Sequence, residues 1–195
     1  MAPAAGAPAA MTAPADDIGR VAELLGHPAR GAFDVVVRDP MGDPVVIRNA
    51  PLLDDGTPMP TRYWLVGPSL HAAVDRLEAG GGVRRASAAV DAGELADAHL
   101  RYAAERDTAL PAGWRGPRPS GGVGGTRAGV KCLHAHYAWH LAGGDDPVGR
   151  WVDERIGMKE PRGTHCGVLC PERPGIMPDG SARAAAGSAK LFRAR

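Results

Sequence analysis

Hydrophobic residues recur every three or four positions in four segments of the chain, which is the spacing of one face of an α-helix. Glycine follows the first two of these segments, and glycine favours the end of a helix. A shorter segment further along has the same character. The pattern predicts helices over residues 16–25, 69–79, 92–108 and 130–141, and a last short helix at 150–156.

Runs of β-branched and aromatic residues predict three short strands between the first two helices, at residues 33–38, 45–48 and 63–66. The turn-rich segment DPMGDP separates the first two runs and predicts a hairpin with a long loop. A sheet this small needs helices to cover a face. We therefore expect an α+β fold, with a small, mainly antiparallel sheet of about three strands packed with about four helices.

The two ends of the chain have few residues that a core could bury. Residues 1–15 are mostly Ala, Pro and Gly, and apolar residues thin out again after residue 157. Such segments do not offset the entropy cost of ordering the chain. We predict a disordered leader at 1–15, in which Met11 is a second candidate start, a single domain at 16–157 and a disordered tail at 158–195.

Composition narrows the class of protein. The 23 Lys and Arg residues balance 22 Asp and Glu residues, so no overall positive field favours nucleic acid. No stretch approaches the roughly 18 consecutive apolar residues that a membrane span requires. Three widely spaced cysteines do not make a disulfide framework, which favours a reducing, cytoplasmic location.

A glycine-rich loop precedes the fourth predicted helix. Gly122, Gly124 and Gly125 would expose backbone N–H groups there, and Arg127 and Lys131 add positive charge. Amide groups at the start of a helix, together with cations, suit an anion such as phosphate or carboxylate. The residue order matches neither a P-loop nor a dinucleotide fingerprint, and a flexible connector is the alternative.

The fourth predicted helix carries cysteine and histidine residues. At about 100° per residue, Cys132 and His136 point within about 40° of one another, as do His136 and His140, whereas His134 lies about 200° from His136. Thiolate and imidazole are typical zinc ligands, so Cys132, His136 and His140 form a candidate zinc site. The alternative is that Cys132 is a small buried hydrophobe and the histidines pack at the helix surface.

Cys132 is also a candidate nucleophile. It would lie in the first turn of the helix beside Lys131, where the helix N-terminus and a cation lower the pKa of a thiol. This arrangement would suit a hydrolase or transferase that acts on phosphorylated or acyl substrates. Cys166 and Cys170, in the predicted tail, offer two further thiolates.

Three segments of the chain resemble a known family. They are residues 122–152, which contain VKCLHAH, residues 51–65 (PLLDDGTPMPTRYWL) and residues 98–107 (AHLRYAAERD). Over about residues 16–157 the chain resembles the bacterial family of unknown function called DUF501. The resemblance implies no established activity. Genes of this family often lie near those of a septum-formation initiator and an exopolyphosphatase, which points to an interaction module connected with cell division or envelope growth.

Two positions depart from the pattern of that family. Asp39 stands in RDPMGDP where the family commonly has cysteine, and Gly67 stands where it often has cysteine or histidine. If those positions supply metal ligands, Asp39 could replace one as an oxygen donor, and Gly67 could not. The matching positions, carried over as candidates without roles, are His99, Tyr102, Arg106, Lys131, Cys132, His134 and His136.

Our leading hypothesis is a cytoplasmic domain that binds a small anion or a metal ion, with zinc as the candidate cofactor, at the glycine loop and the cysteine helix. The alternatives are a module that binds a protein partner, and the hydrolase or transferase. His99, Tyr102 and Arg106 share one side of the third predicted helix. They either line the same cleft as the cysteine helix or cover its exposed edge.

Overall fold

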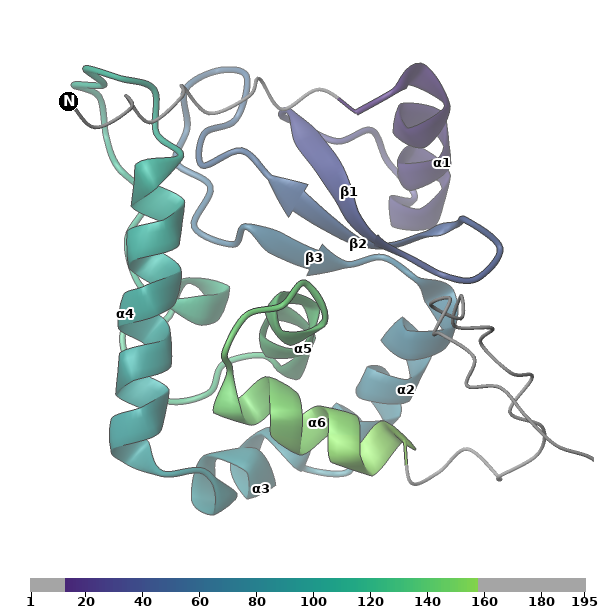
Figure 1. The fold of residues 1–195 in the computed structure, drawn as a ribbon, viewed down its shortest axis with the longest axis vertical. Coiled ribbons are helices and arrows are strands. Elements are labelled where there is room, and N and C mark those ends of the chain that lie inside the picture. Colours follow the sequence, from purple (N-terminus) through teal and green to yellow (C-terminus); the bar gives the residue numbers. More distant parts are fainter. Residues whose placement is uncertain (1–12, 158–195) are drawn as a thin grey trace, which may run out of the picture. The chain divides into compact units, whose positions relative to one another are not determined.

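The computed structural model describes residues 13–157, which form a three-stranded sheet and six α-helices (Figure 1). The α+β fold that the hydrophobic pattern predicts is confirmed. The predicted tail at 158–195 and most of the predicted leader lie outside the described residues. Among residues 13–157, every helix is too short or too polar to cross a bilayer.

The sheet is an antiparallel meander in the order β1 (Phe33–Arg38), β2 (Pro44–Asn49) and β3 (Tyr63–Leu65). All three predicted strands are present, and the first two form the predicted hairpin. The turn between them is closed by Asp39, whose Oδ1 accepts hydrogen bonds from the amides of Met41 and Asp43, each at 2.9 Å. The Asp39 carboxylate is therefore an element of this turn.

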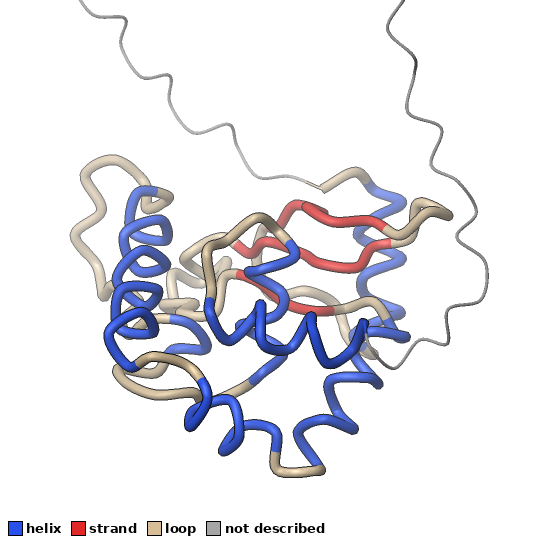
Figure 2. The backbone as a smooth tube through the Cα atoms, turned by 60° about the horizontal axis from the view of Figure 1, so that its bottom comes forward, coloured by secondary structure: helices blue, strands red, loops and turns tan. Residues whose placement is uncertain are grey.

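Residues that pair across β2 and β3 alternate between the two faces of the sheet. Val46 pairs with Leu65, and both belong to the larger core cluster, which also contains the central helix α5 (Leu133–Leu141). Ile47 pairs with Trp64, and both face the smaller cluster formed with α1 (Ala15–Leu25). The sheet thus has α1 on one face and the remaining helices on the other (Figures 1 and 2).

Helix α5 lies at the centre of this second layer, between the sheet and α6 (Pro147–Gly157). Six of its nine residues are buried, so less of this helix is exposed to solvent than in an ordinary amphipathic surface helix. Glycine allows the close approach of α6, because a Cβ at Gly149 would lie 2.3 Å from the Cβ of His140. The neighbouring helices are α2 (Pro68–Ala79) and α4 (Ala92–Thr108).

The helices differ from the predicted ones at three places. The glycine run at 80–82 is only a short break, because Gly81 adopts the left-handed conformation (φ 78°) and α3 (Gly82–Ala89) follows at once. Helix α5 begins at Leu133 rather than at Val130, since Cys132 is extended (φ −152°, ψ 124°). Helix α6 begins three residues before the predicted start. Only α3 is an additional helix, and together with the four main predicted helices and the short last one it makes six.

Candidate functional site

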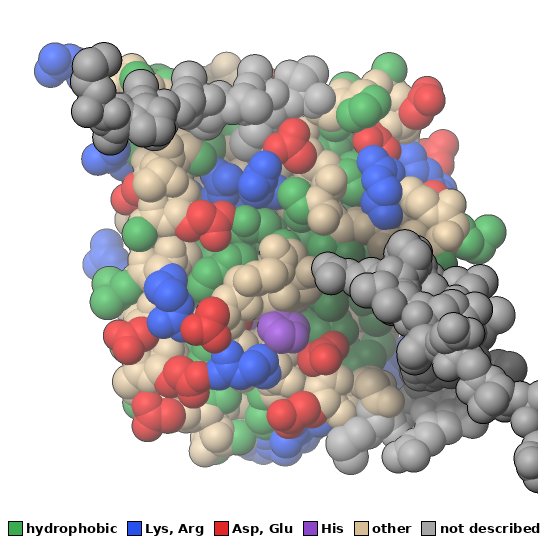
Figure 3. All heavy atoms as spheres, viewed as in Figure 1, with side chains coloured by type: hydrophobic (Ala, Val, Ile, Leu, Met, Phe, Trp, Pro, Cys, Tyr) green, Lys and Arg blue, Asp and Glu red, His purple; other side chains and the backbone are tan. Residues whose placement is uncertain are grey.

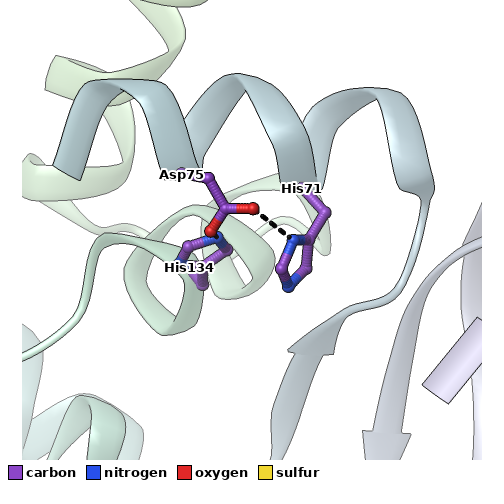
Figure 4. A group of neighbouring side chains, drawn as sticks. All are labelled: His71, Asp75 and His134. Carbon is purple, nitrogen blue, oxygen red and sulfur yellow. Dashed lines mark hydrogen bonds and ion pairs between the residues drawn. The ribbon is translucent and has the colours of Figure 1, made fainter. Parts of the chain in front are cut away.

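Side chains of α2 meet the first turn of α5 at the surface of the second layer. Three of them recur along one face of α2, because positions i, i+4 and i+7 lie above one another on a helix. The other two come from the residue before α5 and from its second residue. The group, called the α2–α5 group below, consists of His71, Asp75, Glu78, Cys132 and His134, three of which are drawn in Figure 4.

His134 is the central member of this group. Its Nδ1 lies 3.3 Å from Glu78 Oε1 and 3.8 Å from Cys132 Sγ. Its Nε2 lies 3.3 Å from Asp75 Oδ1, within ion-pair distance, although the angle does not make a hydrogen bond. His71 holds the other oxygen of Asp75 through Nδ1 at 3.1 Å, and the two imidazole rings are 4.5 Å apart.

Two overlapping sets of metal-ligating atoms result. One set contains His71, Asp75 and His134, and the other contains Glu78, Cys132 and His134. In each set the candidate ligand atoms all lie within 4.8 Å of one another. The imidazole of His134 is only 16% exposed, so the centre of the group is largely shielded from water.

The backbone before α5 explains why Cys132 and His134 face the same side. Cys132 is extended and precedes the helix, so the 100° step between helical residues does not apply to it. Glu78 fixes this geometry, because its Oε1 accepts the amide of Leu133 at 2.5 Å. That hydrogen bond satisfies one of the four N–H groups that a helix leaves free at its start.

The thiol of Cys132 does not have the character of an activated nucleophile. Burial raises its pKa, and the nearby Glu78 carboxylate raises it further. Backbone N–H groups of Ala135 and His134 at the helix start do lower this pKa, as predicted, but burial and Glu78 outweigh them. Lys131 is exposed and does not contribute to the shift. A thiol of this kind is mostly protonated at neutral pH unless a cation displaces its proton.

The predicted zinc ligands do not assemble as a group. Asp39 belongs to the β1–β2 turn. His136 is fully buried, and its Nδ1 donates to Asp146 Oδ2 at 2.7 Å. His140 packs against Gly149 of α6 and stacks on Tyr137. Of the four predicted ligands only Cys132 lies in a candidate metal set. The histidine in that set is His134, which the predicted helix had placed on another face.

The glycine loop binds to itself and to α4. It contains a short 3₁₀ turn, η1 (Val123–Gly125). The amide of Gly122 donates to Thr126 O at 2.7 Å, and that of Gly125 donates to Gly122 O at 3.0 Å. These N–H groups are therefore already engaged within the loop. Arg127 is exposed at the surface beyond it.

The polar stripe of α4 holds the glycine loop in place. His99 Nδ1 accepts the amide of Val123 at 3.1 Å, so the ring proton is on Nε2, which donates to Gly129 O at 3.0 Å. Arg106 donates to Gly121 O at 2.6 Å. Tyr102 lies on the same buried side and its hydroxyl accepts the amide of Arg62 at 2.6 Å.

His99, Tyr102 and Arg106 are all buried, so they do not cover an exposed edge of the helix. Burial also lowers the pKa of His99, which agrees with a neutral imidazole that accepts at one nitrogen and donates at the other.

Sequence reasoning missed the three ligand candidates on α2. The signal was present, because His71, Asp75 and Glu78 fall at helical spacing in a segment that was predicted to be a helix. The prediction of this helix rested on its apolar face alone. The contact between its polar face and the start of α5 is a tertiary contact between segments far apart in the chain, so the sequence pattern does not predict it.

A family model described as "Protein of unknown function (DUF501)" matches residues 35–154, which is more than half of the chain. The match runs from β1 to α6 and includes every member of the α2–α5 group. No curated protein and no solved structure matches the chain. The candidate site therefore lies wholly within the region that the family model matches, and the chain belongs to the DUF501 family.

Proposed function

We propose that the protein binds a divalent transition-metal ion, with zinc as the best fit, between α2 and the start of α5. The ligands would be Glu78, Cys132 and His134, bound through Nδ1. This set combines a carboxylate, a thiolate and an imidazole, which are the three kinds of protein ligand that zinc takes. Magnesium and calcium prefer oxygen ligands alone.

The spacing of the ligand atoms carries the proposal. Atoms bound to a tetrahedral zinc ion at about 2.0–2.3 Å lie about 3.3–3.8 Å from one another. Nδ1 of His134 lies 3.3 Å from Glu78 Oε1 and 3.8 Å from Cys132 Sγ. Small side-chain adjustments would therefore suffice to admit the ion.

Asp75 would act as an outer partner of the metal site. With Nδ1 of His134 on the metal, the ring proton is on Nε2, which lies 3.3 Å from Asp75 Oδ1. A carboxylate at this place fixes the tautomer and raises the basicity of a ligating histidine. His71 positions the carboxylate from the other side. Three protein ligands leave a fourth position for water or for a ligand from a partner.

Metal content and affinity test the proposal. Protein prepared without chelators, in a Cys166→Ser/Cys170→Ser background that removes the two other thiols, should carry about one zinc per chain. Competition with a chromophoric chelator should show Asp75→Asn weaker by about 10–100-fold, and Cys132→Ser and His134→Ala weaker still.

His140→Ala is the matched control, because His140 lies on the same helix outside the α2–α5 group. The zinc affinity of this variant should equal that of the wild type. Zinc far below one per chain with no measurable competition would exclude the site. Equal affinity of the Cys132→Ser protein would exclude this ligand set. The interaction module and the hydrolase or transferase stay predictions from the sequence.

A further inference from the structure

A second candidate site lies at the end of α4 and shares no residue with the α2–α5 group. It is a cleft of about 760 Å³ between the β1–β2 hairpin, the segment after β2 and the end of α4. Much of its wall is apolar and comes from Pro51, Leu52, Leu53, Ala109, Leu110 and Pro111. A volume of this size suits a small organic molecule rather than a bare inorganic ion.

Arg62 brings an almost fully buried charge to this cleft. Its side chain is only 5% exposed, and both Nε and Nη1 are buried without a hydrogen-bond partner among the described residues. The nearest carboxylate oxygen, Glu105 Oε1, lies 3.5 Å from Nε and makes no hydrogen bond with it. A buried guanidinium with unmet donors is costly, and such groups are normally paired.

Two other donors orient the Glu105 carboxylate, so that it forms only a 3.5 Å ion pair with Arg62. Its Oε1 accepts the hydroxyl of Tyr63 at 2.5 Å, and its Oε2 accepts the indole N–H of Trp139 at 3.1 Å. Burial, together with Glu105, raises the pKa of Tyr63 to about 12, so this hydroxyl keeps its proton and continues to donate.

Arg48 is the second cation of the cleft. One of its terminal nitrogens donates to Asp34 Oδ2 at 3.0 Å, whereas its Nε is buried without a partner among residues 13–157. The two arginines come from β2 and from the residue before β3, and both line the cleft. On the face shown in Figure 3, basic and acidic side chains are interspersed, which is unlike the broad basic surface of a nucleic-acid-binding protein.

We infer that this cleft binds a small organic anion. Its oxyanion group, a carboxylate or a phosphate, takes the unmet donors of Arg62 and Arg48, and its apolar body packs on the leucine and proline wall. Planar guanidinium groups match both oxyanions through paired hydrogen bonds. The site does not use the metal, and it differs from the anion site predicted at the glycine loop.

Calorimetric titration of metal-free protein tests the inference with matched probes. Octanoate and octyl phosphate share an apolar chain and differ in the oxyanion, whereas octan-1-ol has the chain alone. We expect at least one anion to bind and the alcohol not to bind. Arg48→Met should weaken that anion by at least about tenfold, because hydrogen bonds to charged groups are lost. Arg62→Lys, which keeps the charge and loses the planar fork, should do the same.

Arg101→Met is the control, since Arg101 lies on the exposed side of α4 outside the cleft, and it should bind as the wild type does. Arg48 is partly exposed, so its variant remains informative if the Arg62 variant does not fold. Binding of octanoate alone assigns a carboxylate, and binding of octyl phosphate alone assigns a phosphate. Binding of neither anion, equal binding of the alcohol, or unchanged affinity in Arg48→Met would overturn the inference.

Discussion

The buried carboxylate of Asp146 offers a strong test of how the centre of the domain is held together. Its Oδ1 accepts the amides of Val148 and Gly149, each at 2.8 Å, and so caps the start of α6. Its Oδ2 accepts Nδ1–H of His136 on α5 at 2.7 Å. Both side chains are 0% exposed. One carboxylate therefore joins the two helices and satisfies three buried donors.

Replacing Asp146 with alanine removes all three hydrogen bonds. Loss of an N-cap side chain typically costs about 1 kcal/mol. Loss of a hydrogen bond to a charged group costs about 1.5–3 kcal/mol, and water cannot replace it readily at a fully buried histidine. We expect the free energy of unfolding to fall by about 2.5–4 kcal/mol, which is a large part of the 5–15 kcal/mol typical of a domain.

Asp146→Asn should have an intermediate effect. Its amide oxygen can still cap α6, but its NH₂ group would face His136. The imidazole would then have to move its proton to Nε2, which is buried without a partner among the described residues. We expect a loss of about 1–3 kcal/mol from this one unsatisfied group.

Urea unfolding followed by circular dichroism measures these effects. With a slope of about 2 kcal/mol per molar urea, Asp146→Ala should lower the midpoint by about 1.3–2 M. The neighbouring Asp145 is the matched control, because its side chain is 64% exposed and forms only surface ion pairs with Arg101 and Arg150. Asp145→Ala should cost less than about 1 kcal/mol. Equal midpoints for the two alanine variants would refute the role of Asp146 as a buried link.

Three further predictions concern the glycine loop, its histidine and the cysteine. Gly122→Ala should lower stability by about 1–3 kcal/mol in thermal unfolding, because the new Cβ would lie 2.4 Å from His99 Nδ1. Gly19→Ala, which meets nothing within 4 Å in helix α1, should be neutral or stabilising. The pKa of His99 is lowered from its ordinary value of 6.5, so the unfolded chain binds a proton at this residue more readily than the folded protein does. The stability that neutral His99 contributes is therefore complete above pH 6.5 and is lost as the pH falls through the lower folded-state pKa. Urea midpoints should therefore fall more steeply below pH 6.5 in the wild type than in His99→Asn, and parallel pH profiles would contradict this. Because the pKa of Cys132 is raised, a disulfide reagent at pH 7.5 should label Cys132 more slowly than it labels free cysteine. The measurement uses protein that lacks the two other cysteines, and labelling faster than that of free cysteine would disprove the buried, protonated state.

The strands and most helices could be predicted from the sequence because their signals are local. β-Branched runs gave β1 and β2, and the apolar spacing gave α2 and α4. The predictions failed where one residue changes the local conformation. Left-handed Gly81 permits a new helix directly after a glycine run, and extended Cys132 delays α5 by three residues.

The candidate site could be predicted only in part, because it depends on contacts between distant segments. The sequence indicated that Cys132 and nearby histidines could bind a metal ion. The choice among the histidines rested on a helix that starts later than expected. The carboxylates of the candidate site come from another helix. Asp146 accepts a hydrogen bond from buried His136 and caps α6, but in the sequence it forms part of an Asp-Asp-Pro segment that predicts only a turn.

The central place of α5 in the fold affects how the protein is made. Strand β3 packs on α5, although about 70 residues separate them in the chain. A ribosome that adds roughly 5–20 residues per second needs about 4–14 s to produce that stretch. Helix α1 is made before the sheet and can cover one face at once. The other face, with Val46 and Leu65, has to wait for α5 and is open meanwhile to chaperones or to other nascent chains. The emergence of α5 from the ribosome therefore sets the end of the period in which the new chain is most prone to aggregate.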